Sequence, residues 1–255
     1  SKLQGGSTSV GGFVRGSDFR ADIQAPFGNR ADVMYLNSNI TPGPQLRTLL
    51  AHEYAHAVLF STRGGGAEED WLNEAIAHLA ENLHGRDWSN LDHRIDAFLQ
   101  SPARCPLVVP DYYRAGRWRD HGCRGATYLF LRWCADAHGD ALLRRLIHSP
   151  QRGVGNVERA TGLPFAELFR CWTIALAQPA DSTQRPNAGF RYLSLHEPVG
   201  DFHLNGIVRD PWTITGPAAQ LSLCGTAVRV MELNAANAPG VFRIAVKADV
   251  AARLQ

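Results

Sequence analysis

The sequence predicts an α+β fold, with a β-containing N-terminal half, a helical lobe and a small C-terminal β module. Three observations support this prediction. Short β-favouring runs lie among glycines as far as residue 39, apolar residues recur at helical spacing from residue 44 to 177, and short β-like runs return from about Phe190. The predicted domains are residues 1–88, 89–180 and 190–255.

The composition is that of a globular protein. The chain has 255 residues, of which 45% are hydrophobic, so it is long and apolar enough to bury a core. The formal net charge is only +2, which disfavours a nucleic acid or an anionic membrane as a partner. No apolar run approaches the ~18 residues that a membrane-spanning helix needs.

The chain begins without Met, in a Gly/Ser-rich stretch, SKLQGGSTSVGG. This stretch lacks the charged and apolar regions of a signal peptide and is typical of a linker, so we expect a processed part of a longer precursor. The five cysteines form no CxxC pair, which argues against a Cys-based zinc site and leaves buried thiols and one or two disulfides both open. They are Cys105, Cys123, Cys134, Cys171 and Cys224.

The best strand candidate in the N-terminal half is ADVMYLNS, residues 31–38. A helix is predicted next, because Pro44 suits a first helical turn and the glycines at 64–66 end the pattern. It has so little polar surface that we expect it to be largely buried. A second amphipathic helix is predicted over residues 70–85, where acidic residues precede an apolar stripe that ends at Gly85.

A Pro- and Arg-rich connection, residues 102–119, leads into the helical lobe. Each helical pattern of the lobe is stopped by Gly or Pro. The patterns are RGATYLFLRWCADAHG, DALLRRLIHS, NVERATG and PFAELFRCWTIALA. The β module is predicted from the runs AVRVMEL and VFRIAVKA, which lie between turn residues.

The first predicted helix contains HEYAH, residues 52–56. Residues four apart project from nearly the same face of a helix, so His52 and His56 can present two imidazoles to one ion. Glu53 lies about 100° round the axis, close enough to act on a water held by that ion without binding the ion itself. This is the HExxH arrangement of zinc enzymes, in which one position on zinc stays open for water and the glutamate takes its proton.

Satisfied core histidines are the alternative interpretation, because a short motif of this kind also arises by chance. The surrounding helix favours the metal site, since two histidines and a glutamate are costly among apolar residues unless they have partners. One zinc ion would supply those partners. The sequence therefore predicts a zinc centre at this helix.

The third zinc ligand is expected from the second helix, DWLNEAIAHLAE, which offers Glu74, His78 and Glu81 on one stripe. If the apolar stripe faces its own core, Glu74 and Glu81 lie on the opposite side. The alternative is a solvated face, which acidic residues usually occupy. The functional interpretation requires this face to meet the histidine helix across the metal.

The pattern HEYAH, then seventeen residues, then WLNEAIAHLAE resembles the gluzincin zinc metallopeptidases, and most closely the hyicolysin-like family. The resemblance covers roughly residues 31–177 and includes RGATYLFLRWCADAHGDALLRRL. It implies a zincin-like fold, with His52, His56 and Glu74 as ligands and Glu53 as general base and acid. It also implies that ADVMYL, with Met34 and Tyr35, is the edge strand along which a peptide substrate lies.

Two departures from the family pattern concern the surroundings of the zinc. Many gluzincins carry an aspartate four residues after the glutamate ligand, where it orients a zinc histidine, and here that position is His78. Glu81, one turn further along, is the candidate replacement. His78 as a ligand in place of Glu74 stays open.

The second departure is the donor that stabilises the oxyanion, which in related enzymes is often a Tyr or His near a Gly-Ala pair. No tyrosine precedes Gly125 and Ala126 at the expected place. His121 is our preferred donor. The other candidates are Arg124, Tyr128, Tyr112 and Tyr113, of which Tyr128 is expected to be a core aromatic.

The sequence therefore predicts a zinc-dependent metalloendopeptidase that acts on a peptide or protein substrate, in an extracellular or periplasmic location. A zinc-binding or adhesion module that has lost catalysis is the first alternative. An aminopeptidase on the same site is the second, although no motif that would anchor a free amino terminus is recognisable. Cleavage specificity and oligomeric state have no signal in the sequence.

Overall fold

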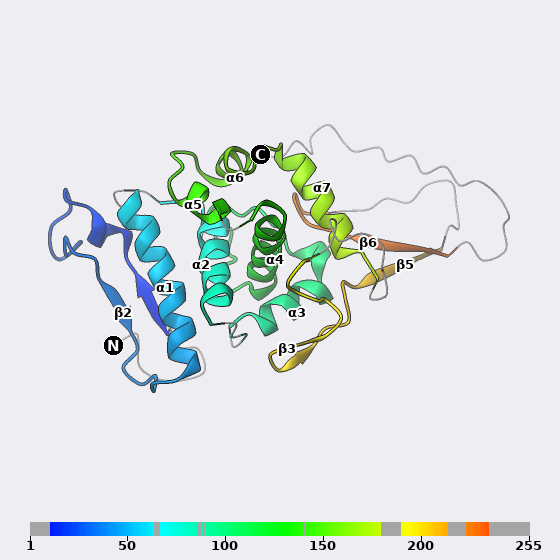
Figure 1. Ribbon diagram of the computed structural model, residues 1–255, viewed down its shortest axis with the longest axis horizontal. Coiled ribbons are helices and arrows are strands. Elements are labelled where there is room, and N and C mark those ends of the chain that lie inside the picture. Colours follow the sequence, from blue (N-terminus) through cyan, green and yellow to red (C-terminus); the bar gives the residue numbers. More distant parts are fainter. Residues whose placement is uncertain are drawn as a thin grey trace.

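The computed structural model describes residues 11–63, 67–85, 88, 90–139, 141–179, 190–213 and 223–234. Helices dominate this part of the chain, and three small two-stranded sheets accompany them, so the fold is broadly α+β as predicted. Figure 1 shows an elongated arrangement, with the N-terminal hairpin and α1 at one end, packed helices in the middle, and β5 and β6 at the other end. None of the described helices combines the length and apolar character needed to cross a bilayer.

The N-terminal hairpin pairs β1 (Gly12–Val14) with β2 (Met34–Leu36) in antiparallel register, with Phe13 opposite Tyr35. β2 is the centre of the strand predicted at residues 31–38, while β1 was not predicted as a separate strand. A short 3-10 helix, η1 (Gly16–Phe19), follows β1. It holds the buried Asp18, which accepts hydrogen bonds from the Tyr35 hydroxyl at 2.9 Å and from the Asn29 backbone N–H at 2.9 Å.

The two predicted helices of the N-terminal half are α1 (Pro44–Thr62) and α2 (Asp70–Gly85). The prediction that α1 is largely buried is wrong, because much of the helix is accessible and Tyr54 is 65% exposed. Most of the positions that are buried carry polar side chains. α2 and the hairpin make most of the contacts with α1, and α5 (Ala141–Ile147) adds a smaller contact, so one stripe of the helix is covered and another faces solvent. The buried stripe of α1 consists of Thr48, His52, Glu53, His56 and Leu59.

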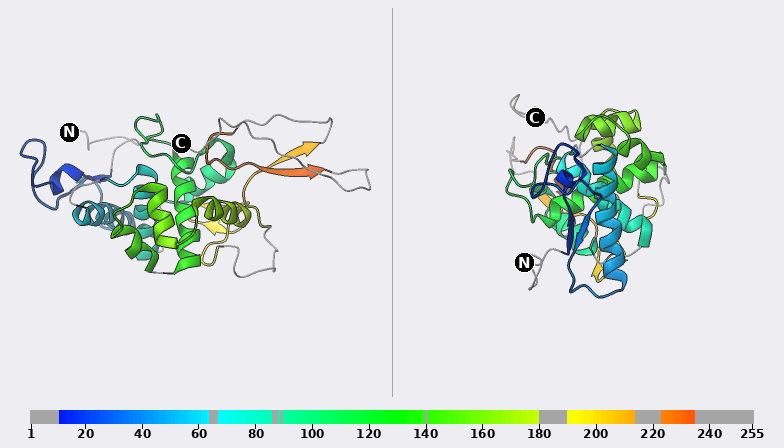
Figure 2. Two further views of the ribbon diagram at one scale, coloured as in Figure 1. Left: turned by 90° about the horizontal axis from the view of Figure 1, so that it is seen from above. Right: turned by 90° about the vertical axis from the view of Figure 1, so that its left-hand side faces the viewer.

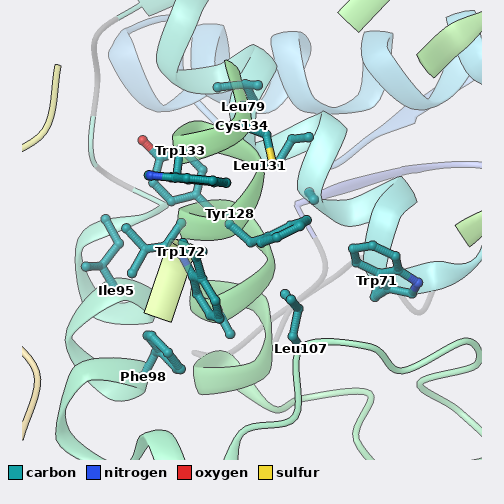
Figure 3. Close-up of a cluster of buried hydrophobic side chains, with 14 of the residues drawn as sticks. Trp71, Leu79, Ile95, Phe98, Leu107, Tyr128, Leu131, Trp133, Cys134 and Trp172 are labelled. Carbon is teal, nitrogen blue, oxygen red and sulfur yellow. The ribbon is translucent and has the colours of Figure 1, made fainter. Parts of the chain in front are cut away.

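The core lies around α4 (His121–His138), which packs against α2, against α3 (Asp92–Gln100) and against α7 (Phe165–Leu176). Figure 3 shows the aromatic centre of this core, with Phe98, Tyr128 and Trp172 among the labelled side chains. The phenyl ring of Phe98 and the indole of Trp172 stack with centroids 5.8 Å apart. α3 was not predicted, and it closes the core by burying Ile95, Phe98 and Leu99.

The remaining helices are α5 (Ala141–Ile147) and α6 (Gly153–Thr161), and a 3-10 turn, η2 (Pro102–Arg104), follows α3. Figure 2 shows these helices from two further directions. The helices α4 to α7 lie on the four predicted helical patterns of the lobe. The stops at Gly and Pro therefore divided this region correctly.

Four short strands form the described C-terminal part. β3 (Pro198–Val199) pairs with β4 (Phe202–His203), and β5 (Arg209–Thr213) runs parallel to β6 (Val230–Asn234). This part packs on the helical region, where Val208 N–H donates to the Leu99 carbonyl at 2.9 Å. The run VFRIAVKA lies outside the described residues.

Candidate metal centre

The two histidines of HEYAH point the same ring atom at each other. The Nε2 atoms of His52 and His56, one helical turn apart on α1, lie 3.1 Å from each other, and both side chains are buried. Two imidazole nitrogens on one tetrahedral zinc ion would lie about 3.3 Å apart, from bond lengths of about 2.0–2.1 Å. The pair is therefore already spaced for a shared cation.

The third candidate ligand comes from α2, as the sequence predicts. Glu74 Oε2 lies 3.7 Å from His52 Nε2, and one ligand atom of each of His52, His56 and Glu74 lies within 4.8 Å of the other two. The face of α2 that carries Glu74 thus meets the histidine face of α1. The alternative of a solvated acidic face does not hold for Glu74, whose side chain is only 13% exposed.

Each histidine is held from behind by an acceptor on α2. His52 Nδ1 contacts Glu81 Oε1 at 2.5 Å, and His56 Nδ1 contacts Asn73 Oδ1 at 2.9 Å. Because these partners accept hydrogen bonds, they favour the proton on Nδ1 and leave an Nε2 lone pair toward the shared point. The two Nε2 lone pairs then point at each other and need either a shared proton or a cation between them. The donor set fits a divalent cation at that point.

His78 takes part in the same network but at a deeper level. Its Nδ1 contacts Glu81 Oε1 at 2.9 Å, while its Nε2 lies 3.8 Å from Glu74 Oε2 and has no hydrogen-bond partner among the described residues. His52, His78 and Glu81 also form a group whose atoms could hold a cation. That group is fully enclosed except at His52, so it offers no open position for water or substrate.

Arg124, from the first turn of α4, contacts the third candidate ligand directly. Its Nη1 donates to Glu74 Oε2 at 2.6 Å. Burial acts to raise the pKa of the Glu74 carboxyl, but Arg124 and then His52 outweigh it and hold this pKa at about 2. Glu74 is therefore an ionised carboxylate at neutral pH, which is the form that binds metal.

Glu53 occupies a different environment from Glu74. It is buried beside the histidine pair, lines the adjacent cleft, and burial raises the pKa of its carboxyl to about 7. A carboxyl with a pKa near neutrality is suited to take up and release a proton. Glu74 thus has the low pKa expected of a metal ligand, and Glu53 has the near-neutral pKa expected of a group that carries protons.

A cleft of about 720 Å³ opens over this centre. α1 and α2 form its floor with His52, Glu53, His56 and Glu74, and β1 and the start of α4 form parts of its wall. Met34 and Tyr35 do not line it, so the structure does not bring the predicted substrate strand to the centre. Met34 borders a second, smaller pocket, and the Tyr35 hydroxyl binds Asp18. β1 takes the place at the cleft because it is the inner strand of the hairpin, next to α1.

The candidate oxyanion donors separate clearly by position. His121 and Arg124 line the cleft, whereas Tyr112 and Tyr128 are fully buried in the core and Tyr113 is 81% exposed outside it. Tyr128 is thus the core aromatic that the sequence predicts. None of the tyrosines considered lines the cleft, although the centre of the Tyr112 ring lies 5.7 Å from the Arg124 guanidinium carbon, which leaves His121 and Arg124 on the α4 side.

The cysteines take no part in this centre, and all five carry free thiols. Cys105 and Cys123 do lie near Asp120 in a group of possible metal ligands. Asp120, however, accepts from the Cys123 backbone N–H at 2.9 Å and from Arg117 at 2.7 Å. Because the guanidinium of Arg117 also lies 3.5 Å from Cys123 Sγ, this group is poorly suited to a cation.

Three contacts of the site were not predicted: Asn73 behind His56, Asn90 on Glu81 at 2.9 Å, and Arg124 on Glu74. Asn73 directly precedes Glu74 in WLNE, so the motif did hold a signal for it. The other two depend on how α3 and α4 pack. No protein-family model and no curated protein matches the chain.

Proposed function

We propose that the protein is a zinc-dependent endopeptidase of the gluzincin type, related to the hyicolysin-like family that its motifs resemble. The observation that carries the proposal is the convergence of His52 Nε2, His56 Nε2 and Glu74 Oε2 at the floor of a cleft, with Glu53 beside them. Two imidazoles and one carboxylate are a ligand set typical of catalytic zinc sites with an open position. Calcium and magnesium prefer oxygen ligands, so they fit this set less well.

When bound, zinc lowers the pKa of a water molecule and polarises the carbonyl of the substrate. Glu53 accepts the proton of the attacking water and then delivers it to the amine that leaves, a double role for which its pKa of about 7 is suited. Glu81 and Asn73 keep the two histidine rings in the orientation that binds metal.

The unpaired edge of β1 offers a place for an extended peptide. Gly11 O accepts a hydrogen bond from Asn37 N–H at 2.8 Å, and alternate residues of an antiparallel strand bond to the same neighbour. Gly12 and Val14 therefore direct their N–H and C=O groups away from β2, and no described strand covers that edge. A substrate strand can pair there, so the role predicted for Met34 and Tyr35 passes to β1.

His121 is the proposed donor to the oxyanion. It is the first residue of α4, lines the cleft on the helical side, and burial followed by the charge of Arg94 lowers its pKa. A neutral imidazole can still donate through one ring N–H. Arg124, bound to Glu74, is the second donor on this wall.

The decisive experiment combines metal analysis with cleavage of an unfolded protein such as reduced casein. The wild-type chain should hold one zinc per molecule and cleave casein, and a chelator should abolish cleavage. Glu53→Gln should keep the zinc and lose at least about 100-fold in rate, because it removes the general base. Glu197→Gln, a matched change at an exposed residue outside the cleft, should cleave normally. Full activity in zinc-loaded Glu53→Gln would refute the assigned mechanism.

A zinc-binding module without catalysis is the second candidate function. The observation that favours it is that no tyrosine considered as a donor reaches the cleft. Zinc bound in the wild type with no cleavage of casein would select this candidate.

A further inference from the structure

The cleft wall formed by α3 and by residues 118–124 is rich in arginine. Arg94, Arg119 and Arg124 all line the cleft, together with His121 and the half-exposed indole of Trp118. Arg124 is engaged with Glu74. Among the residues that the structure describes, no carboxylate forms an ion pair with either of the other two guanidinium groups.

Arg94 is partly buried and has no ion pair with a described acidic residue. Its Nη1 donates to the backbone carbonyl and to Oδ1 of Asn90, and its Nε is buried without a partner among the described residues. Burial, followed by the charge of Arg124, lowers the pKa of Arg94 to about 10. It therefore remains a cation at neutral pH. The charges of Glu81, Glu74 and Asp92 offset part of the cost of burying this cation, but none of these carboxylates forms an ion pair with it in the described part of the chain.

Arg119 presents a second free cation to the same cleft. It is exposed, and it makes no hydrogen bond or ion pair with any residue that the structure describes. The centre of the neighbouring Trp118 ring lies 5.6 Å from the Arg124 guanidinium carbon, so Trp118 makes its cation–π contact with Arg124 rather than with Arg119.

None of the acidic residues that line the cleft forms an ion pair with Arg94 or Arg119. Glu74 is bound to Arg124, and Glu53 stands beside the histidine pair. Asp70 accepts a hydrogen bond from the Tyr112 backbone N–H at 2.7 Å. With a divalent ion held by His52, His56 and Glu74, the cleft would gain still more positive charge, which attracts an anionic ligand.

We propose that the cleft binds a carboxylate of its peptide substrate through Arg94 and Arg119, an inference that rests on the proposed function. A guanidinium offers parallel N–H donors that match the two oxygens of a carboxylate. A peptide can supply this group from a Glu or Asp side chain or from its free C-terminus. The substrate class is thus an acidic peptide or the carboxyl end of a chain.

The test measures binding to zinc-loaded Glu53→Gln protein, so that peptides are held but not cleaved. Four fluorescent decapeptides share one uncharged sequence and differ at two points, an internal Glu or Gln and a free or amidated C-terminus. The peptide that carries the recognised carboxylate should bind about tenfold tighter than its uncharged match, at a fixed ionic strength of about 0.1 M. If the Glu and Gln peptides differ in affinity, the recognised carboxylate is a side chain. If the free and amidated peptides differ, it is the C-terminus.

Variants in the same background assign the effect to residues. Arg119→Gln should bring the affinity ratio close to one, and Arg94→Gln should do the same if its circular dichroism matches that of the parent. Arg114→Gln is the matched control, since this arginine is 88% exposed and lies outside the cleft, and it should keep the full ratio. Equal affinity for all four peptides, no binding of any, or a ratio unchanged in Arg119→Gln would overturn the proposal.

This binding test separates the two proposals. A carboxylate preference in Glu53→Gln, with no cleavage by the wild type, would reject the peptidase and keep the carboxylate site. Cleavage by the wild type without any carboxylate preference would reject only the carboxylate site.

Discussion

One carboxylate, Glu81, joins three side chains behind the candidate metal centre. Its Oε1 contacts His52 Nδ1 at 2.5 Å, His78 Nδ1 at 2.9 Å and Asn90 Nδ2 at 2.9 Å. Burial opposes ionisation of Glu81, but His78 and then His52 outweigh it and hold the pKa of this carboxyl well below its usual range. The residue is therefore a buried anion that fixes the tautomer of a candidate ligand.

We predict that Glu81→Gln weakens metal binding by about 10–100-fold, the usual effect of losing such a partner. The amide keeps the shape of the side chain but removes the negative charge that orients His52 and makes it a stronger ligand. Zinc affinity is measured by competition with a chromophoric chelator, which does not depend on turnover. Glu197→Gln is the control, and equal zinc affinity in Glu81→Gln and wild type would contradict the prediction.

Asp18 is a second buried carboxylate, remote from the metal centre. Burial acts to raise its pKa, but hydrogen bonds from Arg15, Tyr35 and Asn29 outweigh it and lower the pKa below the ordinary value of 3.8. A carboxyl whose folded pKa is lowered stabilises the fold above its unfolded pKa. This contribution is lost as the pH falls through the folded pKa, so the relevant window lies below about pH 4.

We therefore predict that Asp18→Asn lowers the free energy of unfolding at pH 7 and that the difference from wild type narrows below pH 4. Urea unfolding at both pH values measures this difference. Asp32→Asn, at an exposed position between η1 and β2, is the matched control and should leave the free energy of unfolding at pH 7 close to that of wild type. A gap that stays constant down to pH 3 would show that the charge of Asp18 contributes nothing.

At the scale of elements, the contact between α3 and α4 depends on a glycine. A Cβ atom added to Gly125 would lie 2.0 Å from the carbonyl oxygen of Arg94, inside any permitted contact. The backbones of the two helices thus approach more closely than a side chain allows. The same approach places Arg94 and Arg124 together in the cleft wall.

We predict that Gly125→Ala lowers the free energy of unfolding by about 1–3 kcal/mol, because overpacking forces the helices apart. Gly155→Ala on α6 is the matched control, since its added Cβ meets nothing closer than 3.7 Å. That change should be neutral or stabilising by up to about 1 kcal/mol, because alanine is the better helix former. Urea unfolding of both variants measures the contrast, and equal stability of the two would refute the close-contact argument.

Periodicity predicted α2 and α4 to α7, because apolar residues recur in them at helical spacing until a Gly or Pro. α1 was predicted from Pro44 at its start, the glycines after its end and its low content of polar residues. α3 was missed because its stripe is short and lies between polar residues. β1 was missed because three residues among glycines carry almost no pattern. The resemblance therefore gave the role of substrate strand to Met34 and Tyr35, the best strand candidate in that region. For the site, spacing within one helix predicted His52, Glu53 and His56, and the second helix supplied Glu74 and Glu81. The partnership of Arg124 with Glu74 depends on packing between α2 and α4, which no local pattern contains.

At the scale of the whole molecule, the candidate metal centre lies where two parts of unequal size meet. The hairpin and α1 form the end piece seen in Figure 1, and they meet the remaining helices mainly through α2. Polar contacts along this seam include the buried pair of Arg63 and Glu68, whose atoms lie 2.9 Å apart. Few apolar side chains of α1 are buried there, since Leu59 is the one hydrophobic residue among its buried positions.

A cation shared by α1 and α2 should therefore stabilise the end piece more than the core around α4. Zinc at 100 times its dissociation constant should raise the free energy of unfolding by about 2.7 kcal/mol, by mass action on the folded state. Chelation should reverse this gain and speed amide hydrogen exchange in α1 and β1, with little change in α4, whose buried residues pack in the aromatic core. Glu74→Gln should respond weakly to zinc, because only two of the three ligands keep their chemistry. Exchange rates that rise equally in α1 and α4 on chelation, or a zinc effect of full size in Glu74→Gln, would place the cation elsewhere in the molecule.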